Sequence, residues 1–355
     1  MVAKIPDSVT SIGKHAFARC GGLVGLTIGK GVTSIGDAAF ADCIELTRVT
    51  IPDSVTSIGH YAFDSCTGLA SVTIGNRVDS IGQGAFRGCT SLSDITVPDS
   101  VAIIGRDAFS GCTRLWSVTI GNGVTSIDAF VFGGCTGLTS VTIGNSVDFI
   151  GEGAFFYCTS LVNITIPDSV TIIGGSAFYG CTRLWSVRIG NRMEVIGIYA
   201  FANCTNLTRV FFSGDAPSIA SSTFNSTGWF TVHFVPGTAG WDFPFANRTK
   251  EPTGPTFTSG ASASITVGQQ FSFTITADSS PTSFTAMGLP SGLSLDPISG
   301  KISGVATSIG TYTVTLSASN AAGTGSQVLT LTVFLPAPVL TVHAVATVGL
   351  PFNYP

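Results

Sequence analysis

Apolar residues in the first two-thirds of the chain recur with a period of 23 residues. Phenylalanine, isoleucine and leucine all return at this interval, and every cysteine of the chain falls on it: Cys20, Cys43, Cys66, Cys89, Cys112, Cys135, Cys158, Cys181 and Cys204. A unit this short cannot bury its own apolar face, but stacked neighbours can. The fixed period therefore predicts a repeat solenoid in which equivalent residues form columns.

Residues 138–160 show the expected structure of one unit. Val141 and Ile143 alternate with polar residues, which predicts a strand with one buried face. Gly144-Asn145 then predicts a turn, followed by a second short extended piece that ends at Ile150. The segment G-A-F-F-Y-C predicts one helical turn whose inward side chains are Ala154, Phe155 and Cys158.

The frame of the repeat is specific. Residues 51–74 read I-P-D-S-V-T-S-I-G-x-x-A-F-x-x-C-x-x-L-x-x-V-x-I, which resembles the BspA-like leucine-rich repeats of bacterial surface proteins. The resemblance covers roughly residues 3–235. It implies display on the cell surface and, in some members, adhesion to host matrix proteins, with no catalytic residues and no cofactor.

The two ends of the repeat region differ. In the last unit Thr227 replaces the cysteine, Val232 and Phe234 lie one residue early, and Trp241 follows. Bulky apolar residues in an atypical terminal repeat predict a cap at the C-terminal end. Ile5 already occupies a repeat column, so we expect no comparable cap at the N-terminal end.

A different pattern begins after residue 250. Strands are predicted over 270–276, 312–317 and 327–333. Between them, L-P-S-G-L-S-L-D-P-I-S-G-K-I-S-G at 289–304 resembles the immunoglobulin-like domain of bacterial surface proteins, which implies a β-sandwich acting as a spacer or adhesive module. V-G-L-P-F-N-Y at 348–354 repeats V-G-Q-Q-F-S-F at 267–273. We therefore expect the sequence to be a fragment of a longer protein.

The predicted fold is mainly β: a leucine-rich-repeat solenoid with short helical turns over residues 1–250, an immunoglobulin-like β-sandwich over 251–335, and the first strand of a truncated second sandwich over 336–355. That apolar last segment contains Pro336, Pro338 and Pro351, so no membrane span is predicted in this sequence.

Composition excludes several function classes. The net charge is −4 and no basic stripe is present, so no nucleic-acid partner is predicted. The four histidines are scattered, which favours a protein that is not an enzyme. The cysteines form no C-x-x-C pair and have no nearby histidine, so they predict packed thiols and no metal site.

Two polar columns leave alternatives open. An Asp/Asn column at the turn favours side chains that bond the turn's own backbone amides, with shared calcium ions as the alternative. A threonine column on the main sheet is explained by the preference of threonine for strands, with the ordering of ice as the alternative.

Exposed aromatic residues point to a binding surface. They are few in the first four units but frequent later: Trp116, Phe130, Phe149, Phe156, Tyr157, Tyr179, Trp185, Tyr199 and Phe211. The heptapeptide C-T-R-L-W-S-V occurs at 112–118 and 181–187, which places two of these tryptophans in one column. The hypothesised ligand-binding face consists of Trp116, Trp185, Arg188, Arg209 and Phe211, residue types that dominate binding hot spots.

The sequence thus predicts an extracellular or cell-surface protein that binds a protein or glycan ligand, such as a host or matrix surface. The alternatives are a structural spacer of a larger surface protein whose active module lies elsewhere, and a calcium- or ice-ordering repeat surface.

Overall fold

The structure, a computed structural model, describes residues 1–235, 238–241, 249–252, 254–320 and 323–336. These residues form strands and turns and no helix. The chain divides into two compact units, Met1–Thr253 and Gly254–Pro355. The predicted second sandwich copy lies outside the described residues, apart from Pro336 at its margin.

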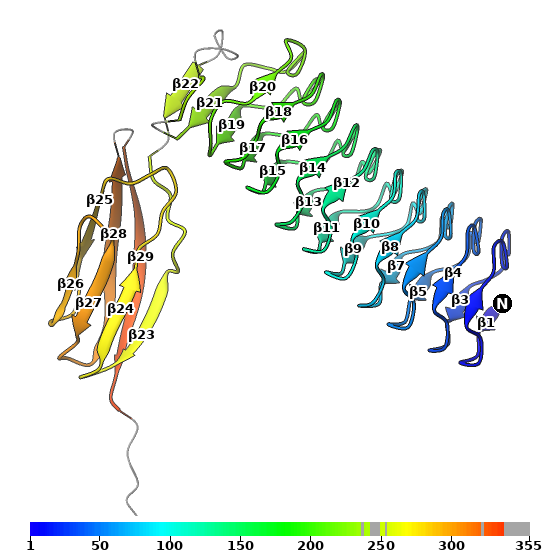
Figure 1. Ribbon diagram of the computed structural model, residues 1–355, viewed down its shortest axis with the longest axis horizontal. Helices are drawn as coiled ribbons and strands as arrows, with labels where there is room; N and C mark the ends of the chain where they lie inside the picture. The colour runs from blue at the N-terminus through cyan, green and yellow to red at the C-terminus, as the bar shows by residue number, and fades with distance from the viewer. Residues whose placement is uncertain (236–237, 242–248, 253, 321–322, 337–355) are drawn as a thin grey trace, which may run out of the picture. The chain divides into compact units, whose positions relative to one another are not determined.

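In the first unit, each 23-residue repeat forms one rung of a parallel β-solenoid (Figure 1). Each rung contributes a main strand, and consecutive main strands lie side by side and parallel. In order along the chain, these strands are β1 (Val2–Lys4), β3 (Gly25–Thr27), β5 (Arg48–Thr50), β7 (Ser71–Thr73), β9 (Asp94–Val97), β11 (Ser117–Ile120), β13 (Ser140–Thr142), β15 (Asn163–Ile166), β17 (Ser186–Ile189), β19 (Arg209–Phe212), β21 (Thr231–Phe234) and β22 (Thr249–Pro252).

The predicted second extended piece is confirmed as a two-residue strand in each rung. These short strands also pair in parallel, within two sheets that meet between β10 and β12. They are β2 (Ser11–Ile12), β4 (Ser34–Ile35), β6 (Ser57–Ile58), β8 (Ser80–Ile81), β10 (Ile103–Ile104), β12 (Ser126–Ile127), β14 (Phe149–Ile150), β16 (Ile172–Ile173), β18 (Val195–Ile196) and β20 (Ser218–Ile219).

The predicted columns form the core. Phenylalanine rings from Phe17 to Phe224 stack along the axis with centroids 5.1 to 5.5 Å apart between neighbours. From Phe40 to Phe201 these rings are fully buried, as are the leucines and most of the cysteines beside them. The stacked rings match the spacing that parallel backbone pairing imposes, so backbone and side chains favour the same register.

The predicted helical turn is wrong, although its inward residues are correct. In residues 59–66, alternate amides bond within their own turn and to the next rung: Asp64 N donates to Tyr61 O at 3.0 Å, and Phe63 N donates to Ala85 O at 2.7 Å. A helix would turn all these amides inward to its own carbonyls. Two residues of the segment, Tyr61 and Ser65, have positive φ, which lets the backbone reach the neighbouring rung.

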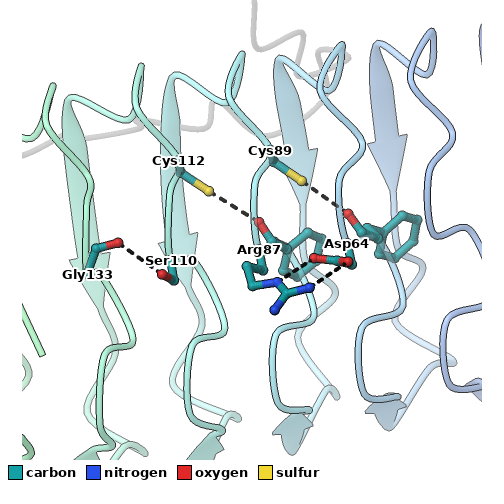
Figure 2. Close-up of polar contacts among 8 residues, drawn as sticks. Asp64, Arg87, Cys89, Ser110, Cys112 and Gly133 are labelled. Atoms are coloured by element: carbon teal, nitrogen blue, oxygen red, sulfur yellow. Dashed lines mark hydrogen bonds and ion pairs between the residues drawn. The ribbon is translucent and has the colours of Figure 1, made fainter.

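The cysteine thiols are hydrogen-bonded to the backbone. Cys89 Sγ donates to the carbonyl oxygen of Phe63, and Cys112 Sγ to that of Phe86, both at 3.2 Å (Figure 2). None of the nine cysteines forms a disulfide. Burial raises the pKa of Cys135 to about 12, so its thiol remains protonated at neutral pH.

The main ladder is interrupted at three prolines. In residues 1–235, all of which are described, pairing falls to one residue pair between β3 and β5 and is absent between β7 and β9 and between β13 and β15. In each case, the corner position at the end of the main strand changes from glycine in one rung to proline in the next: Gly29 to Pro52, Gly75 to Pro98 and Gly144 to Pro167. We call these three junctions the proline seams.

Two properties of proline explain the seams. Proline has no amide hydrogen to donate to the preceding rung. It also needs room: a Cβ on Gly75 would lie only 2.6 Å from the carbonyl oxygen of Pro52, which shows how closely rungs approach at this corner. A proline stacked on the preceding glycine must therefore hold the two rungs further apart.

The seams loosen the core locally. At ordinary junctions, the amide after the main strand bonds to the next rung, as Ile51 N does to Thr73 O at 2.9 Å. Ile28, Ile74 and Ile143 make no such bond within the described chain. Their rungs are also the more exposed ones: Ile143 is 8% exposed, against 1% for Ile166 on the other side of its seam.

Trp241 packs at the C-terminal end of the repeat region, where a cap is predicted. Trp241 is buried, and its ring centroid lies 5.0 Å from that of Phe212 and 5.0 Å from that of Phe234. Its indole Nε1 donates to Thr238 Oγ1 at 2.7 Å. These rings cover the apolar end of the last complete rung, as an atypical terminal repeat should.

The second unit is a sandwich of two sheets, which confirms the immunoglobulin-like fold. One sheet has the order β23-β29-β28-β25 and the other β24-β27-β26. Phe271, Phe284 and Leu316 are among the residues buried in its core. The strands are β23 (Ser262–Thr266), β24 (Gln270–Thr274), β25 (Ser283–Met287), β26 (Leu293–Leu295), β27 (Lys301–Val305), β28 (Gly310–Asn320) and β29 (Gly323–Phe334).

The first prediction concerns the thiols. Cys20 is half-buried and the other eight cysteines are buried, so one thiol of the native protein should react rapidly with a thiol reagent at pH 8, and all nine after denaturation. Because folding raises the pKa of buried thiols such as Cys135, the free energy of unfolding should fall as the pH rises above ~8.5, the ordinary cysteine pKa. Fewer than nine thiols after denaturation without reductant would contradict this packing.

The second prediction concerns the seams. Amides that lack the inter-rung hydrogen bond should need a smaller free energy of local opening before they exchange with solvent than amides that make the bond. We expect the amides of Ile74 and Ile143 to exchange with deuterium at least ~10-fold faster than that of Ile51, measured by NMR at single-amide resolution. Equal protection of the three amides would show that the seams are closed in solution.

Candidate functional site

The C-terminal part of the main sheet brings together four of the five residues of the hypothesised face. Strand pairing places Arg188 opposite Phe211, and Phe211 opposite His233, in one column. The neighbouring column contains Ser186 and Arg209. Trp185 immediately precedes β17 and therefore lies at the edge of the same face.

Two arginines of this face stack on aromatic rings in neighbouring rungs. The guanidinium carbon of Arg209 lies 4.9 Å from the Trp185 ring centroid, and that of Arg188 lies 5.2 Å from the Phe211 centroid. Phe211 in turn stacks on His233, with centroids 4.5 Å apart. Each exposed cation–π pair contributes only ~0.5–1 kcal/mol. Its larger effect is to hold long side chains in one arrangement.

We call this group the Trp–Arg surface; its members are Trp185, Arg188, Arg209, Phe211 and His233. The Trp185 side chain is 44% exposed and the two arginines are exposed, whereas Phe211 and His233 are half-buried. The surface therefore offers one wide aromatic ring and two guanidinium groups held by neighbouring rings. Preorganised aromatic and arginine side chains of this kind are favourable for binding because little rotamer freedom is lost on contact.

Trp116 does not join this group. It is 53% exposed and precedes β11, in the same column as Trp185 but three repeats earlier. Two rungs and the β13/β15 seam separate the two tryptophans, and strand β11 belongs to a different sheet. The structure therefore divides the predicted face into a clustered part and a separate tryptophan.

His233 was not predicted from the sequence. The repeat frame shortens by one residue in the last unit, which moves His233 into the column of Phe211. Val232 and Phe234 lie one residue early in the repeat frame, and this shift is visible in the sequence. Counting back from them would have placed the histidine beside the phenylalanine.

Several other exposed aromatics have a structural role at the turn edge. Tyr61, Phe130 and Tyr157 each have positive φ, and each precedes by one repeat a glycine: Gly84, Gly153 and Gly180. A Cβ on Gly180 would lie 2.7 Å from Tyr157 Cδ1, so the ring occupies the space that a side chain would fill. Phe156 and Tyr179 stack beside them with centroids 5.3 Å apart. These rings pack along the edge, where two further arginines stack on them: Arg87 lies 5.1 Å from the Tyr61 centroid and Arg106 5.3 Å from the Phe130 centroid.

The Asp/Asn column links rungs, which corrects the predicted role of these side chains. Oδ1 of Asp53 accepts the amide of Asn76 at 2.7 Å, and Oδ1 of Asp168 accepts that of Asn191 at 2.9 Å. The predicted bonds lay within each turn, whereas the bonds formed reach the next repeat. Among the described residues, no group of three or more His, Cys, Asp or Glu side chains could hold a metal ion.

The described part of the chain also contains no helix of the length and apolar character needed to cross a membrane.

Comparisons with known proteins assign both units. Residues 2–116 and 103–231 match the family described as "BspA type Leucine rich repeat region", and residues 249–334 match the family described as "Putative Ig domain". No curated protein matches the chain.

Solved structures similar to the chain include bacterial leucine-rich repeat proteins. One from Bacteroides ovatus is 27% identical, with 59% of this chain and 78% of that chain covered and a TM-score of 0.29. The leucine-rich repeat protein of T. pallidum is 30% identical, with 58% and 77% covered and a TM-score of 0.39. A leucine-rich cell surface protein of Faecalibacterium prausnitzii is 30% identical, with 61% and 79% covered and a TM-score of 0.32.

Repeat and immunoglobulin-like units of these two families are typical of bacterial surface proteins involved in binding, and they are typically not enzymes. The family match covers more than half of the sequence, over the same residues that form the solenoid. The chain therefore belongs to the BspA type leucine-rich repeat family.

Proposed function

We propose that this protein is a cell-surface or extracellular binding protein that docks a protein ligand on the Trp–Arg surface, without catalysing a reaction. The immunoglobulin-like unit serves as a spacer or stalk. The observation that carries the proposal is the pair of stacked contacts, Arg209 on Trp185 and Arg188 on Phe211, on one face of one sheet.

The local sequence supports a functional origin for this surface. The three-repeat duplication that copied C-T-R-L-W-S-V explains why tryptophan occurs at both 116 and 185. It does not explain Arg188 or Phe211, because the columns of the earlier copy hold Thr119 and Thr142. Replacing threonine, which suits an exposed strand, with arginine and phenylalanine exposes cationic and aromatic groups that strand formation does not need.

The charge of the surface indicates the kind of protein that would dock. The Trp–Arg surface contains two cations, Arg188 and Arg209, and Glu251 of β22 follows His233 in the column of Arg188 and Phe211. A partner that presents carboxylates beside apolar side chains would complement this arrangement, since opposite potentials across an interface favour encounter and fix the register.

An ice-ordering surface is less well supported. Such a surface needs a regular flat array, and the proline seams interrupt the threonine column between Thr27 and Thr50, between Thr73 and Thr96, and between Thr142 and Thr165. From Arg188 onward, threonine is absent from the column.

The third prediction tests the Trp–Arg surface. Purified fibronectin, fibrinogen, laminin and collagen would be titrated against the immobilised protein by surface plasmon resonance. For any that binds, Trp185→Ala should raise Kd by roughly 30-fold, the equivalent of ~2 kcal/mol for a hot-spot residue. Arg209→Gln should act in the same direction, because it removes the charge that stacks on Trp185.

Trp116→Ala is the matched control, since it deletes the same side chain from the same column at a site without a stacked arginine. Its Kd should stay within ~2-fold of the parent, as expected for a residue outside a hot spot. A folded Trp185→Ala variant that binds as well as the parent would eliminate this surface as the docking site. Absence of binding to all four proteins would exclude matrix ligands of this kind.

A further inference from the structure

The seam between β13 and β15 opens into a hollow on the main sheet face. The cavity has a volume of about 680 Å³, within the ~300–1,000 Å³ range of small-molecule sites. Its lining includes Thr142, Asn145, Thr165, Asp168, Ser169 and Arg188. Only Arg188 is shared with the Trp–Arg surface.

Pro167 accounts for the hollow. It follows β15 and faces Gly144 of the preceding rung, so β13 and β15 do not pair. The amide of Ile143 makes no hydrogen bond within the described chain, and the carbonyl oxygen of Thr165 does not receive it. At the ordinary junction of Ile51 and Thr73 the equivalent groups are 2.9 Å apart and bonded.

Two side chains at this seam are also without the contacts that their counterparts make. The Asn122 side chain accepts the amide of Asn145 at 2.8 Å, but the Asn145 side chain accepts no amide from the next rung in the described chain. Ser169 Oγ is shielded from solvent and has no partner among the described residues, as is also true of Ser54 Oγ at the Pro52 seam, whereas Ser100 Oγ at the Pro98 seam donates to Val78 O at 2.7 Å. The Asn145 carboxamide is exposed and open to a ligand in the hollow, whereas Ser169 Oγ is shielded and is not.

The chemistry of these groups selects the ligand. They include a backbone N–H, a backbone carbonyl, a carboxamide and the hydroxyls of Thr142 and Thr165, which together offer both donors and acceptors. Asp168 and Arg188 contribute one charge of each sign, so the lining has no net charge. An anionic ligand would be repelled by the Asp168 carboxylate, and a cationic ligand by the Arg188 guanidinium. An apolar ligand would leave the polar groups of the lining without hydrogen-bond partners.

We propose that the β13/β15 hollow is a binding site for a short neutral saccharide. Each saccharide hydroxyl can donate and accept at once, so a polyol satisfies a mixed set of groups that no singly charged or apolar ligand can. Of the apolar lining, Val141 is half-buried and offers contact for the C–H groups of a sugar ring, whereas Ile143 and Ile166 are buried beneath it. This site goes beyond the protein-docking surface and does not depend on it.

The seam near the N-terminal end is less suited to this ligand. The hollow over the β3/β5 junction has a volume of about 400 Å³ and is lined by Val2, Val24 and Leu26 beside Arg48 and three threonines. It contains no carboxylate, carboxamide or serine. The β13/β15 hollow is the larger and the more varied in its polar groups.

The fourth prediction uses Pro167→Gly, which should close the seam without removing any of the polar side chains that would contact the saccharide. Glycine restores the form of an ordinary rung, so Ile143 N–H should bond to Thr165 O and the rungs should approach. We would titrate lactose, maltose, cellobiose and N-acetyllactosamine into the full chain by isothermal calorimetry and saturation-transfer NMR. At least one should bind the parent, and Pro167→Gly should weaken its binding by at least ~10-fold.

Pro98→Gly is the matched control, because it makes the same substitution at the β7/β9 seam and should leave saccharide binding unchanged. Thr142→Val is a second test that keeps the seam open and removes one hydroxyl from the hollow. It should weaken binding several-fold, as expected when a hydrogen-bonding partner is lost. Circular dichroism and thermal unfolding would establish that each variant is folded.

Three outcomes would overturn the proposal: no binding of any of the four saccharides, unchanged binding by folded Pro167→Gly, or unchanged binding by folded Thr142→Val. Loss of saccharide binding in Trp185→Ala with none in Pro167→Gly would place the sugar on the Trp–Arg surface instead. Preferential binding of N-acetylneuraminic acid over the neutral sugars would contradict a neutral ligand. The test of protein docking uses different ligands and shares only the Trp185→Ala variant, so its outcome is read separately.

Discussion

The main sheet of the solenoid depends on the close approach of one rung to the next at the corner that follows the main strand. There the backbone leaves no room for a Cβ: on Gly75 it would lie 2.6 Å from the carbonyl oxygen of Pro52. This contact sets how closely the main strands pair, whereas ring stacking and thiol bonds persist even across a proline seam, as Phe40 on Phe63 at 5.1 Å and Cys66 Sγ to Phe40 O at 3.1 Å do. A stack of identical units transmits such a spacing along its whole length, because each unit contacts only its neighbours.

Proline at the same corner breaks the regularity in a controlled way. Pro52, Pro98 and Pro167 each hold a rung away from its predecessor, and the loosened rungs expose slightly more of the core. The second ladder and the phenylalanine column continue across the β3/β5, β7/β9 and β13/β15 seams. The core therefore remains continuous while one sheet face opens. A repeat protein can acquire a local hollow in this way by one substitution, without an insertion that would disturb the 23-residue frame.

The sequence was sufficient to predict which residues form the repeat columns. It was insufficient to predict the hydrogen bonds between neighbouring rungs. Periodicity placed Phe155 and Cys158 in the core, because burial follows directly from an invariant apolar position in a stack. It predicted a helical turn over 153–158, because spacing alone cannot distinguish a helix from successive turns whose alternate amides bond to the next rung. The Asp53 side chain was assigned to its own turn for the same reason. Its acceptor role depends on the neighbouring rung, which lies 23 residues away in sequence and directly alongside in space.

The candidate sites show the same division. The choice of Trp185, Arg188, Arg209 and Phe211 came from departures from the repeat, and the structure shows that these departures stack on one another. Trp116 shares the repeat position of Trp185 but lacks an arginine in the next rung, where Thr139 and Ser140 follow. In a solenoid, a residue is flanked by the residues one repeat earlier and one repeat later. Whether its side chain can contribute to binding therefore depends on which residues stand in those two neighbouring rungs. Pro167 illustrates the point most directly, since it shapes the hollow through the glycine it faces and through the bonds it prevents in the adjacent rung.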